Sequence, residues 1–346
     1  MKTIINNINI VTLDKIIKNG AVIISDGVIE KVLSAPVKDD SAIDGTGKYL
    51  IPGFIDMHCH GGNGLDFIDC SVDEMNALGE FHLMHGTTTM LATTLTAREN
   101  LTEKCLETFK AYKEKYPNGN LIGMHMEGPW FSPAQCGAQD VSNMKNPDAK
   151  ELERIKKDYP FVLRVSAAPE LDGGMEFGRK AVELGIVASA GHTDADFDTI
   201  VQAFDNGYNL LTHFYSGMKG VTRVNAYRVA GAVDAGYYLD DMNVEIIADG
   251  RHLPESLLKL IYKLKGVDKI SLVTDATRGC GMAEGTKSFI GPKEDAMPIV
   301  IKNDVAFMAD GQSFAGSTAT YDRLYRVMAK VTDNDFIALS KMASYN

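Results

Sequence analysis

Seven residues of the types that bind metal ions or carry protons occupy similar places in this sequence. Each follows closely on a short apolar segment. Five of the seven are histidines, and the chain has only eight histidines in all. The seven are His58, His60, Glu127, His192, His213, His252 and Asp275. Imidazole and carboxylate groups together suit zinc, iron, manganese or cobalt, so the pattern predicts a divalent metal site with zinc as the leading candidate. In an extended segment residues two apart face the same side, which allows His58 and His60 to act together.

Each of these residues taken alone has a simpler explanation. A lone histidine at a strand end, such as His252, commonly reaches a loop carbonyl. Asp275 is of a type that caps a following helix, and Glu127 by itself could pair with an arginine. One architecture accounts for all seven residues together, so we favour a shared site over separate structural roles.

The remaining histidines fit structural roles better. His82 and His85 lie in a segment of helical character that stops before Gly86. His125 precedes Glu127 by two residues and shares its strand face, which leaves open either a structural role or support of the site.

Eight short apolar segments carry the candidate residues at or just beyond their ends, and most intervals between them have helical periodicity. The expected strands cover Ile51–His58, Thr87–Thr94, Leu121–Glu127, Val162–Ala168, Ile186–Gly191, Leu210–Phe214, Val244–Ala248 and Ile270–Thr274. The expected helices include Val72–His85, Leu101–Lys113, Met175–Leu184 and Pro254–Lys265. This alternation predicts an α/β protein with a (β/α)8, TIM-like barrel, in which catalytic residues lie at the C-terminal ends of the strands.

The alternative is an open, doubly wound sheet, but no glycine-rich phosphate turn follows the first strand. We assign residues 48–287 to the barrel. Residues 1–47 and 288–315 contain strand and turn patterns, and we expect them to form together one small β-sandwich domain. Residues 316–346 are expected to form C-terminal helices, at Arg323–Lys330 and Asn334–Ala343.

The composition is that of an ordinary globular protein. The net charge of −11 argues against a nucleic-acid partner, because phosphate backbones bind basic surfaces. The five cysteines form no CxxC pair, which suits a reducing compartment better than a disulfide framework. The first residues lack the features of a signal peptide, and no apolar run reaches the length of a membrane span. We therefore expect a cytoplasmic protein without a membrane partner.

Several motifs carry a family resemblance. PGFIDMHCHGG resembles the first-strand motif of the amidohydrolase superfamily. The motifs that follow, and their order along the chain, are similar to those of N-acetylglucosamine-6-phosphate deacetylases. They are HMEGPW, SAAPE, AGHTDA, LTHFYSGM, ADGRHLP, LVTDAT and FAGST. This resemblance covers nearly the whole chain and implies hydrolysis of the N-acetyl group of an amino sugar phosphate.

The resemblance also implies a role for each candidate residue. Glu127, His192 and His213 would hold one metal ion, and His58 with His60 would hold a second that Glu127 bridges, so one or two ions bind per chain. Related dihydroorotases and hydantoinases instead use a carboxylated lysine on the fourth strand, and the corresponding VLRVSAAPE contains no lysine. Asp275 would take the proton of the attacking water and pass it to the leaving nitrogen, while a metal or His252 would polarise the carbonyl.

The chain departs from the family pattern where substrate phosphate is held. Ser216-Gly217 stands in place of Asn-Ala, and VTRVNAYRVAG replaces a segment whose arginine reaches the neighbouring subunit. Arg223 or Arg228 could take over that role in a homodimer, and Gln139 and Arg251 are further candidates for the substrate pocket. The family also continues with strands that complete its β-domain, so we expect an incomplete small domain here.

Two other functions fit the same residues. The chain could be an amidohydrolase that deacetylates a different amino sugar or an N-acyl amino acid. It could also bind metal without catalysis, although Asp275 would then serve no purpose.

Overall fold

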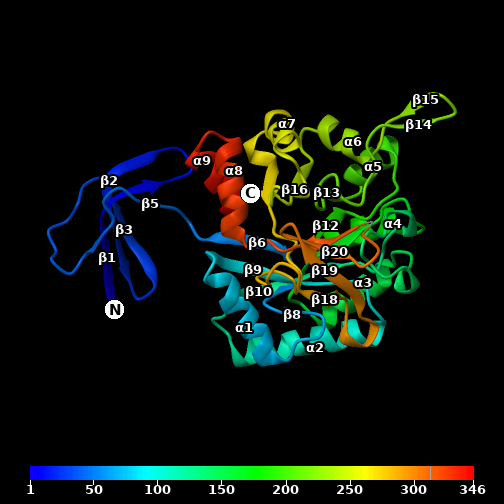
Figure 1. Ribbon diagram of the computed structural model, residues 1–346, viewed down its shortest axis with the longest axis horizontal. Helices are drawn as coiled ribbons and strands as arrows, with labels where there is room; N and C mark the ends of the chain where they lie inside the picture. Colours follow the sequence, from blue (N-terminus) through cyan, green and yellow to red (C-terminus); the bar gives the residue numbers. More distant parts are fainter. Residues whose placement is uncertain (312) are drawn as a thin grey trace.

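Eight parallel strands form the centre of the molecule (Figure 1). The computed structural model describes residues 1–311 and 313–346. In their order around the sheet, the strands are β6 (Phe54–Cys59), β9 (Thr87–Thr94), β10 (Leu121–Glu127), β11 (Val162–Ala167), β12 (Val187–Ala190), β13 (Tyr208–Leu211), β16 (Asn243–Ile246) and β17 (Ile270–Leu272). All eight expected strands are confirmed, and two of them match the expected bounds without change.

Hydrogen bonds join the first strand to the last. The backbone N–H groups of His60 and Gly61 both donate to Ala276 O, and Asp275 N donates to His58 O at 2.9 Å. Cys59 and Ala276 form a parallel bridge at the same place. These contacts close the barrel, exclude an open sheet and place Asp275 beside His58.

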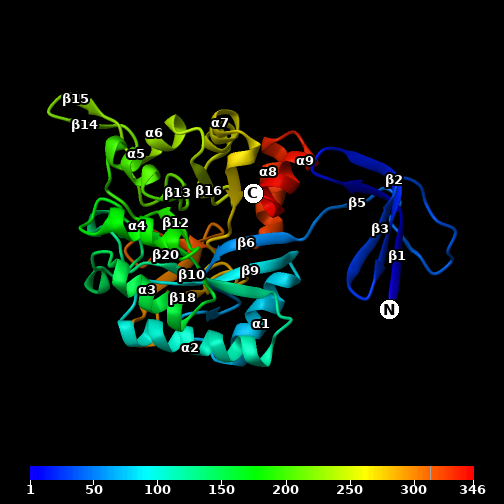
Figure 2. The same ribbon diagram turned by 180° about the vertical axis from the view of Figure 1, so that it is seen from behind.

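Helices cover the outside of the barrel (Figures 1 and 2). They are α1 (Val72–Leu83), α2 (Glu99–Lys115), α3 (Ala149–Asp158), α4 (Gly174–Glu183), α5 (Phe197–Asp205), α6 (Ala232–Tyr238), α7 (Glu255–Lys265), α8 (Tyr321–Val331) and α9 (Phe336–Ser344). Helix α1 illustrates the local cause: Ser71 and Glu74 form a capping box, and Met75, Leu78 and His82 are buried at helical spacing. No helix in the described residues is long and apolar enough to cross a bilayer.

A small sheet stands beside the barrel. It consists of β1 (Lys2–Val11), β2 (Ile16–Ser25), β3 (Val28–Leu33), β4 (Ile43–Asp44) and β5 (Tyr49–Leu50). Helix α9 lies between this sheet and the barrel, and the rings of Tyr49 and Phe336 stack 4.3 Å apart (Figure 1). Since Tyr49 and Leu50 pair with β1, the small sheet extends slightly past residue 47.

The expectation that residues 288–315 join residues 1–47 in one domain is wrong. Strands β18 (Lys287–Ile290), β19 (Met297–Lys302), β20 (Val305–Met308) and β21 (Phe314–Ser317) form an antiparallel sheet of their own. Ser317 bridges to Ala276 at the closure of the barrel. The apolar face of this sheet buries Ile290, Ile299 and Ala306 against Leu95, which directly follows β9. That burial keeps the segment at the barrel, away from the small sheet.

A two-stranded hairpin projects from the opposite side of the molecule from the small sheet (Figures 1 and 2). It is formed by β14 (Thr222–Val224) and β15 (Tyr227–Val229), and Arg223 pairs with Arg228 across it. A second short pair, β7 (Gly61–Gly62) and β8 (Leu65–Asp66), follows the first barrel strand.

Candidate active site

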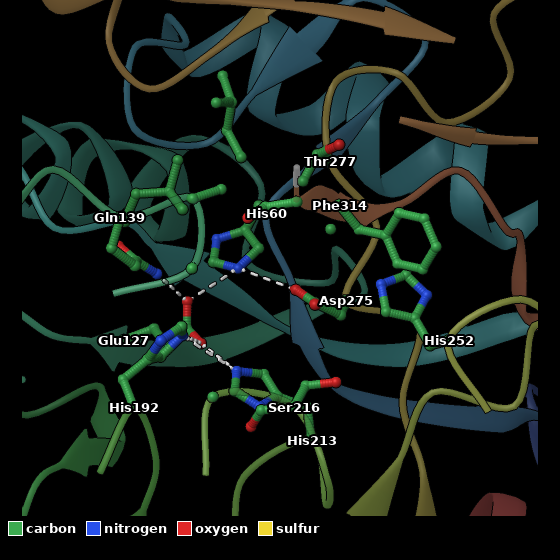
Figure 3. Close-up of a pocket in the computed structure, with 17 residues that line it drawn as sticks. His60, Glu127, Gln139, His192, His213, Ser216, His252, Asp275, Thr277 and Phe314 are labelled. Carbon is green, nitrogen blue, oxygen red and sulfur yellow. Dashed lines mark hydrogen bonds and ion pairs between the residues drawn. The ribbon is translucent and has the colours of Figure 1, made fainter. Parts of the chain in front are cut away.

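The seven candidate metal-ligating and proton-carrying residues lie at the C-terminal end of the barrel, and Figure 3 labels all of them except His58. His58 lies in β6 and Glu127 is the last residue of β10. The others follow their strands by a few residues, because each strand ends just before the mouth of the barrel. These are His60, His192, His213, His252 and Asp275.

Three of these residues have an unusual backbone conformation. The φ angles are 46° at His192, 29° at His213 and 46° at Asp275. Residues other than glycine rarely adopt positive φ, and such conformations persist only where the surroundings enforce them, often at functional sites. Each of the three turns the chain at the end of its strand. The barrel thereby aims these side chains inward.

One group of possible ligands consists of Glu127, His192 and His213. Oε1 of Glu127 lies 3.3 Å from His192 Nε2 and 3.0 Å from His213 Nε2, and the two nitrogens are 3.2 Å apart. Nδ1 of His192 donates to Gln135 O at 2.7 Å, and Nδ1 of His213 donates to Ser216 O at 3.1 Å. A ring that donates from Nδ1 carries a lone pair on Nε2, the atom that faces the group.

A second group adjoins the first and shares Glu127. Nε2 of His60 lies 3.2 Å from Glu127 Oε2, and Nε2 of His58 lies 3.4 Å from Glu127 Oε1. The two Nε2 atoms are 3.3 Å apart. Asp275 Oδ1 approaches both, at 3.4 Å from His58 and 3.2 Å from His60.

Both groups fit a divalent metal ion. Bonds of about 2.0–2.2 Å in tetrahedral geometry place neighbouring ligand atoms about 3.3–3.6 Å apart, close to the distances seen here. The ligand atoms of each group lie within 4.8 Å of one another and the residues are buried. Neutral imidazole nitrogens around one carboxylate are a typical donor set for zinc and similar ions.

The electrostatics of the site favour bound positive charge. Burial lowers the pKa of His58 and His60, but the carboxylates of Glu127 and Asp275 outweigh it and raise the pKa to about 9 for His58 and about 10 for His60. Burial raises the pKa of Glu127 and Asp275, but the facing histidines outweigh it and leave both below their usual range. The site thus attracts protons when no other cation is present, and a metal ion can replace them.

These groups open into a cavity of about 260 Å³. His252 and Asp275 lie on one side of it, and Nδ1 of His252 donates to Asp249 Oδ2 at 2.8 Å, which fixes its ring (Figure 3). Ser216, Gly217 and Gln139, expected from the sequence, also line the cavity. The remaining lining includes Leu95, Gly137, Ala138, Thr277, Ile290, Ser313, Phe314 and Gly316.

Gln139 contacts the centre of the site directly. Its Nε2 donates to Glu127 Oε2 at 2.6 Å, and its Oε1 accepts from the backbone N–H of Thr96 at 2.7 Å. Gly217 is needed for space and for its φ of 57°, since a Cβ there would lie 3.0 Å from His192 Nδ1. The loops after β10 and β13 therefore pack tightly against the ligand groups.

The three arginines considered from the sequence as substrate contacts do not line this cavity. Arg251, expected to line the pocket, instead pairs with Asp304 at the surface at 3.0 Å, and this expectation is wrong. Arg223 and Arg228 are exposed on the hairpin that projects into solvent, so neither contacts the site of its own chain.

The other histidines lie outside the two groups. His82 is buried and its Nε2 lies 3.1 Å from Gly61 O, whereas His85 pairs with Asp322. His125 packs edge-on against the His58 ring at 4.7 Å, and its Nε2 lies 2.8 Å from Ser166 Oγ.

Sequence reasoning missed three residues that support the site. Glu245 and Arg164 form a buried ion pair beside His58, and Asp249 holds His252. Burial raises the pKa of Glu245, but the Arg164 guanidinium and His58 outweigh it and lower the pKa to about 2. A charged residue in the middle of an apolar strand, as in NVEI and VLRVSA, was the signal that could have revealed the pair.

Comparison with known proteins identifies the family. Residues 49–346 match the amidohydrolase family. The chain belongs to this family. Among its relatives, an N-acetylglucosamine-6-phosphate deacetylase of Lysinibacillus sphaericus is 32% identical over 355 residues, covering 100% of this chain and 88% of the relative. An N-acetylgalactosamine-6-phosphate deacetylase of Escherichia coli O157:H7 is 30% identical and covers 89% and 79%, respectively.

Solved structures agree with the fold of this amidohydrolase. An N-acetylglucosamine-6-phosphate deacetylase from Thermotoga maritima superposes with a TM-score of 0.86 at 30% identity, and one from Mycobacterium smegmatis with 0.88 at 28%. Each comparison covers 99% of this chain and 88% of the other. The resemblance inferred from the sequence motifs is thereby confirmed, and the family is metal-dependent.

Proposed function

We propose that this amidohydrolase removes the N-acetyl group of N-acetylglucosamine 6-phosphate, producing acetate and glucosamine 6-phosphate. The observation that carries the proposal is the position of Asp275. Its carboxylate lies within 3.4 Å of His58 and His60, at the edge of two histidine–glutamate groups and open to one cavity. A proton carrier beside metal ligands is what hydrolysis of an amide requires.

The residues of the chain divide the chemistry among them. A divalent ion, with zinc as our first candidate, would be held by Glu127, His192 and His213, and a second by His58, His60 and Glu127. Such an ion polarises an amide carbonyl and makes water a nucleophile near neutral pH. Asp275 takes a proton from the attacking water as the new C–O bond forms. It returns that proton to the nitrogen as the C–N bond breaks, so the amine leaves neutral.

His252 and Gln139 orient the reacting groups. Asp249 occupies Nδ1 of His252, so Nε2 is the ring atom left to contact the acyl group. Gln139 holds the Glu127 carboxylate through its amide N–H. Both side chains line the cavity, which limits the positions open to the N-acetyl group.

The sugar phosphate would be bound by the loop after β13 together with a second subunit. Ser216 and Gly217 line the cavity, but the backbone N–H of Ser216 already donates to His213 O, and a phosphate also attracts a cation. The projecting hairpin carries Arg223 and Arg228 beside exposed apolar residues, with Tyr227 78% exposed. An exposed apolar arm is typical of a subunit contact, so we propose a homodimer in which this arm reaches the partner's site.

Acetate release from purified protein tests the proposal. The substrates are N-acetylglucosamine and N-acetylgalactosamine, each with and without 6-phosphate, and an N-acetyl amino acid, assayed alongside metal analysis. We expect zinc in the protein and the fastest release from N-acetylglucosamine 6-phosphate. The galactosamine epimer is the second candidate, because one relative is named for it. Bound metal without release from any substrate would contradict the proposal.

A further inference from the structure

A fully buried ion pair crosses the interior of the barrel beside His58. Arg164 on β11 donates from both terminal nitrogens to Glu245 on β16, with 2.8 Å between Nη2 and Oε2. The exposed fractions are 1% for Arg164 and 0% for Glu245. Removing two charges from water is costly, and apolar residues often stabilise a core as well. The pair therefore calls for an explanation other than stability.

Glu245 contacts both groups of possible ligands. Its Oε2 lies 3.4 Å from His58 Nδ1 and 3.3 Å from the backbone N–H of His213, which donates to it. When His58 donates its Nδ1–H to this carboxylate, the lone pair is on Nε2. That nitrogen faces Glu127 and His60.

The contact between Glu245 and His58 matters more to the second ligand group than any single hydrogen bond matters to the first group. His192 and His213 are each held at Nδ1 by a backbone carbonyl. In the His58–His60–Glu127 group, Nδ1 of His60 has no hydrogen-bond partner among the described residues. In this second group, Glu245 is accordingly the residue that orients an imidazole, that of His58, through a contact at Nδ1.

Arg164 holds Glu245 in place through contacts to several strands. Besides Glu245, its guanidinium donates to Met57 O at 3.2 Å, Ser189 Oγ at 3.1 Å and Thr212 Oγ1 at 3.3 Å. Met57 directly precedes His58 in β6. The pair thus ties the carboxylate to the strand that carries the histidine.

We propose that Glu245, held by Arg164, is a positioning residue that orients His58 and so makes His58, His60 and Glu127 a second metal site. The inference rests on the proposed metal-dependent function but concerns only the occupancy of that second group. Groups that hydrogen-bond to metal ligands typically change metal affinity about 10–100-fold when they are removed.

Zinc titration of the metal-free protein by calorimetry, with metal analysis, tests this role. Three variants are compared with wild type: Glu245→Gln, the double variant Arg164→Met/Glu245→Leu, and His60→Gln as a reference for a lost second site. Glutamine keeps an acceptor oxygen, and the double variant leaves no unpaired buried charge. We expect two ions per chain in wild type. The second ion should bind about 10–100-fold more weakly in the double variant, with an intermediate loss of affinity in Glu245→Gln, and the first ion should lose less affinity than the second in both variants.

Wild-type affinity for the second ion in the double variant would overturn the inference, and so would a wild-type chain that binds a single ion. If the double variant does not fold, Glu245→Gln decides in the same way. Acetate release is measured separately. A chain that loses its second ion as expected but releases no acetate from any substrate would refute the proposed function and leave this inference supported.

Discussion

The Nε2 atoms of His192 and His213 lie 3.2 Å apart at the mouth of the barrel. Each ring donates from Nδ1 to a backbone carbonyl, so both Nε2 atoms carry lone pairs that face one another. Two lone pairs at this distance repel unless a cation lies between them. The contact therefore favours a bound cation, and its removal has measurable consequences.

Removal of metal should lower thermal stability. An ion present at about 1,000 times its dissociation constant adds about 4 kcal/mol to the free energy of unfolding, and its loss lowers Tm on the order of 10 °C. Calorimetric scans with and without chelator measure this change. The variant His192→Ala should show a smaller chelator effect than wild type, whereas His85→Ala, which changes a histidine away from both ligand groups, should retain the full effect. Identical melting temperatures with and without chelator in wild type would contradict a metal site here.

Asp275→Asn should retain metal but lose about 10²–10⁴-fold in turnover. Asparagine keeps the shape of the side chain, but an amide cannot carry the proton from water to the leaving nitrogen. Metal content and acetate release, measured on the same preparation, check both parts. An asparagine variant with near-normal turnover would remove Asp275 from the chemistry.

His82 should make the protein less stable in acid. Burial is the main cause that lowers the pKa of His82 from 6.5 to about 4, since the neutral ring is preferred in the fold. As the pH falls, the unfolded chain binds the proton at a higher pH than the folded chain. The contribution of neutral His82 to the free energy of unfolding is therefore fully present above about pH 6.5, and it is lost as the pH falls from about 6.5 to about 4. The shift corresponds to roughly 3 kcal/mol.

The variant His82→Gln tests this contribution, because its amide can still donate to Gly61 O. Urea unfolding at pH 7 and pH 4.5 gives the loss of stability for each protein. We expect a smaller loss in the variant than in wild type. Equal losses would show that His82 does not set this part of the acid sensitivity.

Removal of either arginine on the hairpin should selectively weaken the binding of phosphorylated substrates. If the arm reaches the partner subunit, Arg223→Ala or Arg228→Ala should raise KM about 10–100-fold for the 6-phosphate and leave unphosphorylated sugar unchanged, as expected for a charge-assisted hydrogen bond. Arg251→Ala is the matched control, because that arginine pairs with Asp304 at the surface. An unchanged preference for phosphate in both hairpin variants would exclude the arm as the phosphate contact.

Backbone amides of the small sheet should exchange hydrogen faster than those of the barrel. Its buried apolar cluster contains Ile8, Ile10 and Val22, whereas Val28 and Ile29 on the edge strand β3 are 67% and 63% exposed. Little buried apolar area allows local opening at low cost in free energy. Mass-spectrometric exchange of β1–β3 against β9–β12 measures the difference. Equal protection in both parts would contradict this expectation.

The sequence by itself determined the barrel and the position of its chemistry. Expected apolar strands of five to eight residues and intervening helical periodicity are local signals, and a closed barrel brings the ends of all eight strands to one mouth. This is why Glu127, His192 and His213 were expected near one another from spacing alone.

Only the tertiary structure decided which residues and surfaces these local elements pack against. Alternation in residues 288–315 indicated strands but not their partner, and burial against Leu95 placed them at the barrel. Arg251 follows a barrel strand as the site residues do, yet its side chain turns to Asp304. Arg164 and Glu245, 81 residues apart, form their pair only because the closed barrel brings β11 and β16 across from each other. Local pattern determines whether a side chain is buried, whereas its partner depends on how distant strands are arranged.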